Sequence, residues 1–153
     1  MITAWRLVRR RQAADAFSGE GARRYGGRWN HRGTPVVYLA DSLALAALEQ
    51  FVHLGHAYAG LRFVFFHVAI PDEAVESVGP GDLPPNWRTE PPPEETKDLG
   101  TAWTRRSRAA VLKVPSAIVP VEVNYVLNPL HPDAQRLRRS PPESFHFDPR
   151  MWK

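Results

Sequence analysis

Three residues within the segment 23–50 have side chains suited to a charged, ring-containing substrate: Arg28, Tyr38 and Glu49. Glu49 belongs to a very apolar stretch, 42–54, whose pattern predicts a helix. Its polar side chains fall on one narrow stripe with Ser42 and His53. In one interpretation, Glu49 and His53 form the solvent face of a mostly buried helix, the usual place for charged residues. In the other, the stripe lines a cleft, where a partly desolvated carboxylate acts strongly on nearby charge.

Arg28 lies in the glycine-rich sequence YGGRWNHRG. The glycines Gly26, Gly27 and Gly33 permit positive φ angles and a close backbone approach. Such a loop can offer backbone N–H groups and a guanidinium to a phosphate, or it can be a turn with a surface arginine. The spacing fits neither a P-loop nor a dinucleotide fingerprint.

Tyr38 and Arg6 each lie in a short apolar stretch that is typical of a strand. Tyr38 can be a core residue whose hydroxyl reaches the surface, or an aromatic shelf for a flat ring. Arg6 points either to solvent by strand alternation or into a site. Ser116 follows a proline at a predicted strand end and can be a turn-stabilising hydroxyl.

Two kinds of catalytic site find no support in the sequence. There is no G-x-S-x-G motif, and Ser116 has no evident serine-hydrolase partners. The six histidines contain no HExxH motif. His53 and His56 have helical spacing but no carboxylate at ligand spacing, so we expect no metal.

Composition indicates one globular domain over residues 1–153, because the length and the 43% of hydrophobic residues suit a single core. Cysteine is absent, which excludes disulfides and thiol chemistry. The N-terminus becomes charged too early for a secretory signal, and no apolar run reaches the ~18–20 residues of a membrane span. We therefore expect a soluble cytoplasmic protein. The net charge of +4 favours an anionic partner.

Strand and helix signals mix without regular βαβ alternation, which predicts an α+β fold with a mainly antiparallel, curved or split sheet and flanking helices. Strands are predicted at 3–8, 35–40, 62–70, 110–114, 121–127 and 144–148. Helices are predicted at the start of 10–30 and over 42–54, 93–109 and 131–139, with Gly55 ending the second. Residues 79–93 are proline-rich and predict a surface loop.

Several motifs in this order resemble the RES-domain toxins of bacterial RES–Xre toxin–antitoxin pairs. They are GGRWN, G-x-P-V-V-Y-L, A-x-x-E, V-P-S and N-Y-x-x-N-P, and the resemblance runs from about residue 3 to 148. The family is named after an arginine, a glutamate and a serine, and the matching positions are Arg28, Glu49 and Ser116.

The resemblance implies a fold like that of diphtheria-toxin-type ADP-ribosyltransferases, with NAD+ as substrate. It implies cleavage of the nicotinamide–ribose bond by phosphorolysis or hydrolysis, or ADP-ribosylation of a metabolic enzyme. The implied partner is an Xre-type antitoxin that covers the active site and itself binds DNA, so the toxin needs neither direct DNA binding nor a membrane.

In this reading Glu49 stabilises positive charge on the ribose. Arg28 and Arg6 grip the pyrophosphate or ribose, and Tyr38 stacks on nicotinamide. Ser116 is expected to bind the nicotinamide amide or a phosphate, and Tyr25 and Asn124 are further substrate-binding candidates. A basic nucleic-acid-binding module remains an alternative, supported by arginine clusters at 9–11, 105–108 and 136–139. Against it, no aromatic residues interleave with these clusters as they do in single-strand binders.

Overall fold

A single curved β-sheet organises the chain in the computed structural model, which describes residues 1–54 and 60–152. Within these residues the sheet has eight strands, in the order β4-β5-β6-β2-β1-β3-β7, with β8 also paired to β3. The strands are β1 Ile2–Arg9, β2 Val37–Ala40, β3 Phe63–Ile70, β4 Val75–Ser77, β5 Val111–Pro115, β6 Val123–Leu127, β7 Arg138–Arg139 and β8 Glu143–Phe145.

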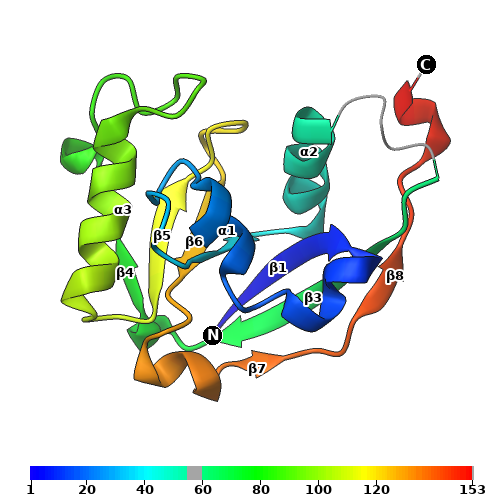
Figure 1. Cartoon of the computed structure of the whole chain (residues 1–153), viewed down its shortest axis with the longest axis horizontal. Helices are drawn as coiled ribbons and strands as arrows, with labels where there is room; N and C mark the ends of the chain where they lie inside the picture. Colours follow the sequence, from blue (N-terminus) through cyan, green and yellow to red (C-terminus); the bar gives the residue numbers. More distant parts are fainter. Residues whose placement is uncertain (55–59, 153) are drawn as a thin grey trace.

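Helices flank this sheet, as Figure 1 shows. The α-helices are α1 Glu20–Tyr25, α2 Leu43–Leu54 and α3 Glu94–Arg106. The short 3-10 helices are η1 Arg10–Asp15, η3 Asp72–Ala74, η4 Pro80–Asp82, η5 Pro132–Arg136 and η6 Pro149–Trp152. No helix in the described ranges is both long and apolar enough to cross a bilayer.

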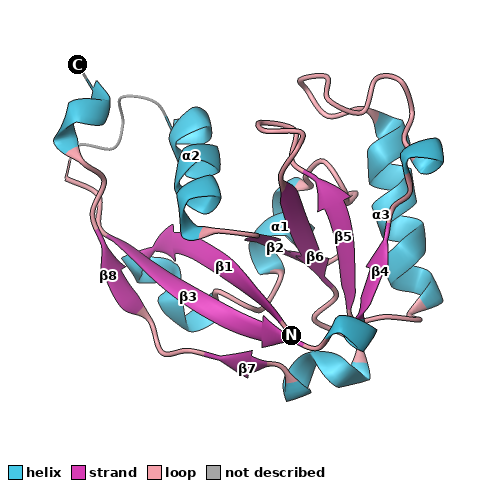
Figure 2. Ribbon diagram, turned by 180° about the vertical axis from the view of Figure 1, so that it is seen from behind, coloured by secondary structure: helices cyan, strands magenta, loops and turns pink. Residues whose placement is uncertain are grey.

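The sheet splits between β1 and β2, which share the single register pair Trp5–Ala40. On one side β1 pairs with β3 along its whole length, and on the other β2 pairs with β6 and β6 with β5. Among the strand pairs in the described part of the chain, only β4–β5 is parallel. Seen from behind in Figure 2, the two groups of strands diverge, and α2 stands beside the point where they separate. This confirms the predicted α+β class and the mainly antiparallel, split sheet.

Helix α2 is positioned by its N-terminal cap and by a narrow buried face. The Ser42 hydroxyl accepts a hydrogen bond from the Leu45 backbone N–H at 3.0 Å, which satisfies a free donor of the first turn. Leu45 and Ala46 pack in one apolar cluster with Leu7 and Phe63 from the neighbouring strands. The helix is therefore anchored at its start, and its second half, including Glu49, extends along the gap in the sheet. Gly55, the predicted stop, lies outside the described residues.

Helix α3 packs on the glycine-rich loop through Gly100, where its backbone comes close to the Trp29 backbone, and through the buried Trp103, which clusters with Trp29. Its acidic first turn and basic last turn match the helix dipole, as predicted. Thr96, Gly100 and Trp103 are buried at helical spacing. A Cβ added at Gly100 would clash with the Trp29 carbonyl oxygen, and the Thr101 hydroxyl accepts from the His31 N–H at 3.0 Å. Helix α3 therefore fixes the loop that carries Arg28.

Local predictions were most accurate for long periodic elements and weakest for short ones. The helix expected at 131–139 is wrong in type: it is the 3-10 helix η5 followed by β7, which pairs with the edge of β3. The closing strand is β8 rather than 144–148. The strands β4 and β7 were missed because strands of two or three residues carry almost no periodicity.

We expect the substitution Gly100→Ala to lower the free energy of unfolding by about 1–3 kcal/mol, because overpacking outweighs the better helix propensity of alanine. The matched control is Gly21→Ala in α1, where an added Cβ meets nothing within 4 Å. Urea denaturation of both variants checks this. A Gly100→Ala protein as stable as the wild type would show that the loop and α3 are not tightly packed.

Candidate active site

A cavity of about 730 Å³ lies beside α2, where the sheet splits. This volume is in the usual range of small-molecule sites. Five of the residues proposed from the sequence line it: Arg6, Arg28, Tyr38, Glu49 and Asn124. The other lining residues are Trp5, Leu7, Gly26, Gly27, Trp29, Leu39, Ala40, Ala46, Gln50, Val52, His53, Arg88, Glu90, Pro92, Ala117 and Ile118.

Glu49 is held at the cavity wall by two side-chain donors, one on β6 and one directly after β5. Asn124 Nδ2 donates to Glu49 Oε1 at 2.9 Å, and Ser116 Oγ donates to Glu49 Oε2 at 3.0 Å. Burial raises the pKa of the Glu49 carboxyl, while the two hydrogen bonds lower it and nearby Glu122 raises it. The interpretation of Glu49 as part of a cleft is therefore the one that the structure supports. The carboxylate is fixed in orientation and partly removed from water.

Ser116 lies behind Glu49 and does not line the cavity. Its side chain is fully enclosed, and its hydroxyl accepts from the backbone N–H groups of Ile118 and Val119, each at 3.2 Å. With both N–H groups pointing at its oxygen, the hydroxyl hydrogen is left to donate to Glu49. In this structure Ser116 therefore contacts the carboxylate of Glu49 from outside the cavity, whereas the sequence led us to expect it at the substrate.

The side chain of Arg28 lines the cavity and is largely buried. Its Nη1 donates to the backbone carbonyls of Trp87 at 2.9 Å and Thr89 at 2.8 Å. Its Nη2 donates to Glu90 Oε2 at 3.0 Å. The loop that follows η4 thus fixes the guanidinium. The sequence did not predict that this loop contacts the glycine-rich loop.

Tyr38 uses its hydroxyl inside the protein. The hydroxyl donates to Asn30 Oδ1 at 2.6 Å and accepts from the Trp29 N–H at 3.1 Å. Burial raises the pKa of the Tyr38 phenol, so the group stays neutral at ordinary pH. A Cβ at Gly27 would meet the Tyr38 hydroxyl at 2.6 Å, which explains the glycine by close approach. Because both hydrogen bonds hold the hydroxyl, the ring of Tyr38 forms a rigid aromatic part of the cavity wall.

Arg6 supplies a second positive charge to the cavity. Its Nε donates to the Ala16 carbonyl at 2.9 Å and its Nη1 to the Tyr38 carbonyl at 3.1 Å. Burial lowers the pKa of Arg6 to about 10, so the guanidinium remains charged at neutral pH. Within the described residues, Arg6 has no carboxylate within 4.0 Å. An arginine held by carbonyls without a counter-ion is suited to an anionic ligand.

The residues that line the cavity differ from the predicted site residues in two ways. Tyr25 is 74% exposed and does not line the cavity. Arg88, Glu90 and Gln50 line it and were missed. The first two lie in the proline-rich loop, whose sequence shows no sign of folding back onto Arg28. Gln50 stands next to Glu49 in α2 and donates to the Leu7 carbonyl at 2.8 Å.

The one potential metal-binding group among the described residues lies outside this cavity. His31 Nε2 is 2.6 Å from Asp98 Oδ1 and its Nδ1 is 3.7 Å from Glu94 Oε2. Both carboxylates are exposed on α3, and none of the three residues lines the cavity. His53 lines the cavity, and His56 lies outside the described residues.

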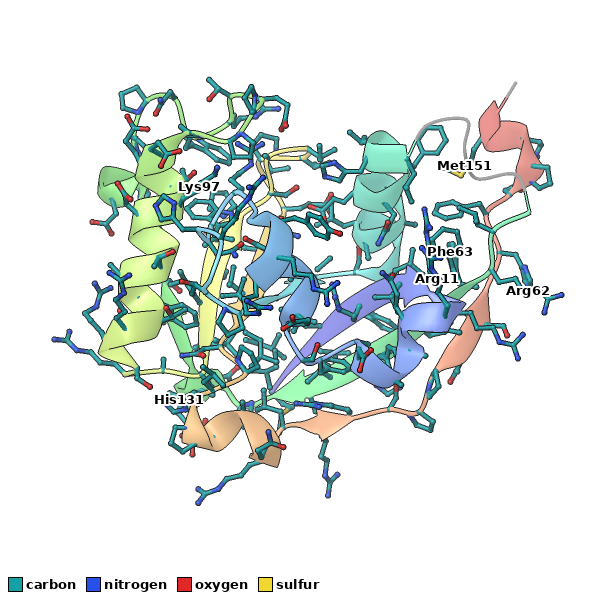
Figure 3. The ribbon with its side chains drawn as sticks, in the orientation of Figure 1. Arg11, Arg62, Phe63, Lys97, His131 and Met151 are labelled. Atoms are coloured by element: carbon teal, nitrogen blue, oxygen red, sulfur yellow. The ribbon has the colours of Figure 1, made fainter. Side chains whose placement is uncertain are left out.

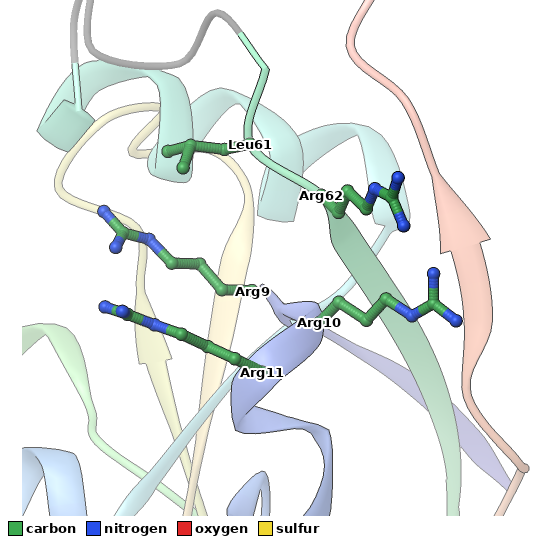
Figure 4. Close-up of a pocket in the computed structure, with 5 residues that line it drawn as sticks. All are labelled: Arg9, Arg10, Arg11, Leu61 and Arg62. Carbon is green, nitrogen blue, oxygen red and sulfur yellow. The ribbon is translucent and has the colours of Figure 1, made fainter.

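A separate basic cavity of about 380 Å³ lies where β1 meets η1. It is formed by Leu61 and four arginines, Arg9, Arg10, Arg11 and Arg62, drawn in Figure 4. Figure 3 shows Arg11 and Arg62 at the β8 side of the molecule, away from α3. Arg105 and Arg106 form the last turn of α3 and Arg108 follows it, whereas the arginines at 136–139 belong to η5 and β7.

Comparison with known proteins gives one family. The RES domain model matches residues 3–148. A protein named Toxin Res from Yersinia enterocolitica is 43% identical over 148 residues, covering 96% of this chain and 97% of the relative. The Prs ADP-ribosylating toxin of a Sphingobium species is 41% identical over 152 residues, covering 96% of this chain and 94% of the relative.

A third similarity is local. The NAD(+) phosphorylase MbcT of Mycobacterium tuberculosis is 58% identical over 36 residues, which are 23% of this chain and 19% of that protein. The family assignment rests on the other matches, which extend over almost the whole of this chain and of both relatives. The protein belongs to the RES-domain family, whose members compared above include proteins named as toxins.

Proposed function

We propose that this protein is the toxin of a toxin–antitoxin pair and consumes NAD+ by cleaving its nicotinamide–ribose bond. The observation that carries this proposal is the fixed carboxylate of Glu49 in a cavity that also holds the guanidinium groups of Arg6 and Arg28. The names of two relatives, an ADP-ribosylating toxin and an NAD(+) phosphorylase, support this choice of substrate.

Cleavage of the glycosidic bond develops positive charge on the ribose, in an oxocarbenium-like transition state. A carboxylate that is already oriented stabilises this charge without reorganising during the reaction. Nicotinamide leaves as a neutral ring, so no general acid is needed to protonate it. One carboxylate therefore suffices, and Ser116 and Asn124 keep the oxygens of Glu49 directed for this purpose.

The remaining residues of the cavity have binding roles in this proposal. Arg6 and Arg28 neutralise the pyrophosphate, and Tyr38 offers its ring to nicotinamide. Holding the substrate at both ends brings the ribose carbon close to Glu49 and lowers the entropic part of the barrier. We assign no metal to the reaction, because the His31–Glu94–Asp98 group lies outside the cavity.

Three acceptors are compatible with this chemistry: inorganic phosphate, water and a protein side chain. Transfer to a protein is the second candidate function, because the relative named as an ADP-ribosylating toxin aligns along nearly the whole chain. The partner we propose is an Xre-type antitoxin that covers the cavity. Leu48 and Val52 are exposed on α2, and Val52 lies at the cavity, which gives such a partner apolar contacts. We place the activity in the cytoplasm.

We expect Glu49→Gln to reduce kcat for NAD+ loss by about 10²–10³-fold, because it removes a preorganised charge that acts in the transition state. Glu143→Gln, on the exposed strand β8, is the matched control and should keep wild-type activity. Nicotinamide release by the purified proteins is the measurement, with circular dichroism to confirm folding. Wild-type turnover by a folded Glu49→Gln protein would refute the proposed mechanism.

The acceptor is identified by incubating the wild-type protein with NAD+ in the presence and absence of inorganic phosphate. Phosphorolysis gives ADP-ribose 1″-phosphate only when phosphate is added, whereas hydrolysis gives ADP-ribose in both reactions. Mass spectrometry separates the products. A labelled protein band after incubation of labelled NAD+ with cell lysate would instead favour ADP-ribosyltransfer.

The pH dependence should report the environment of Glu49. Activity requires the carboxylate, so kcat/KM should fall as the pH decreases through the pKa of Glu49, which lies above its ordinary value. Asn124→Ala removes a donor that favours the charged form, so the acid limb should move to higher pH. A pH–rate profile of both proteins checks this. An acid limb that is unchanged in Asn124→Ala would mean that another group titrates.

A further inference from the structure

The guanidinium of Arg28 already holds an anion, and that anion is a side chain of the same protein. Its Nη2 donates to Glu90 Oε2 at 3.0 Å, and both residues line the large cavity. Glu90 is the carboxylate paired with Arg28 among the described residues. Because Arg28 is the candidate pyrophosphate ligand, Glu90 occupies a position where a phosphate oxygen of the substrate would bind.

The hydrogen bonds of Arg28 divide into a fixed and an exchangeable part. A guanidinium has five N–H donors, and here Nη1 is engaged by the carbonyls of Trp87 and Thr89. Among the described residues, the edge formed by Nε and Nη2 makes one hydrogen bond, to Glu90. This edge is the one that can bind a phosphate with two parallel hydrogen bonds. A phosphate can therefore replace Glu90 while the two carbonyls keep the guanidinium in place.

The two partners differ in exposure, which decides which of them moves. The side chain of Arg28 is 15% exposed, whereas that of Glu90 is 69% exposed. An exposed carboxylate regains water when it leaves an ion pair, so such pairs contribute little free energy. Glu90 can therefore turn into solvent, whereas Arg28 is enclosed and remains in the cavity wall.

The loop that carries Glu90 has contacts that do not involve its carboxylate. Thr89 bonds to the Asn86 carbonyl through both its N–H at 3.0 Å and its hydroxyl at 2.9 Å. Arg88 Nε donates to the Ala117 carbonyl at 3.0 Å. Removing the charge of Glu90 should therefore leave the loop and the Arg28 carbonyl contacts intact.

We propose that Glu90 is an internal competitor for the anion subsite at Arg28 and thereby sets the affinity for the substrate. The proposal rests on the proposed function in that it takes a pyrophosphate-containing ligand as the occupant of the cavity. Each binding event exchanges the Glu90 carboxylate for a phosphate oxygen on Nη2. Glu90 modulates substrate affinity in this scheme and takes no part in bond cleavage.

Titration calorimetry on the full-length protein with ADP-ribose tests the proposal directly, because this ligand keeps the pyrophosphate but has no nicotinamide to lose. We expect Glu90→Gln to bind ADP-ribose about two- to fivefold more tightly than the wild type, the range of an exposed ion pair. The matched control is Glu73→Gln in η3, an equal change of charge at an exposed residue that does not line the cavity. Its affinity should be unchanged. Nicotinamide, which carries no anion, should bind equally to all three proteins.

Two results would overturn the proposal in different ways. Unchanged or weaker ADP-ribose binding by Glu90→Gln, with normal binding by the wild type, would reject competition by Glu90 and leave the proposed function intact. An equal gain in Glu73→Gln would also reject it, since general charge would then explain the effect. If the wild type and all variants fail to bind ADP-ribose, the proposed function fails together with this inference.

Discussion

The site depends on keeping a carboxyl group partly away from water without leaving it unsatisfied. Burial works against the charged form of Glu49, and two directed donors, Asn124 and Ser116, work for it. The Ser116 hydroxyl can donate because two backbone N–H groups of the turn after β5 point at its oxygen. A change in that turn would therefore alter the charge and orientation of a residue on a different element.

The architecture supplies this environment through the gap in the sheet. Because β1 and β2 share one register pair, the two groups of strands separate, and α2 lies along the opening with Glu49 facing inward. The glycine-rich loop closes the cavity on another side. That loop is held by α3, where Gly100 allows the Trp29 backbone to approach and Thr101 accepts from His31. Thus α3, which does not line the cavity, still determines where Arg28 lies.

The cavity holds its arginines and Glu49 by different kinds of contact. Two arginines are held by backbone carbonyls, and Glu49 is held by side-chain donors from β6 and from the turn after β5. Carbonyl contacts orient a guanidinium without neutralising it, so its charge remains available to a ligand. Because the charge of Arg28 remains available, it can form an ion pair with Glu90. In the free protein this carboxylate of the neighbouring loop is the anion at Arg28.

The sequence alone determined the elements whose signals are local. The apolar periodicity of 42–54 and the β-branched and aromatic residues of 62–70 specified α2 and β3. The motifs indicated the family and four residues of the cavity, and the first apolar strand added Arg6. Only the tertiary structure decided which atoms meet. Ser116 lies 67 residues from Glu49 and Glu90 lies 62 residues from Arg28. Contacts at such separations depend on strand order and loop path, which a residue's own neighbours in the chain do not encode. For that reason the sequence predicted neither the hydrogen bond from Ser116 to Glu49 nor the ion pair between Glu90 and Arg28.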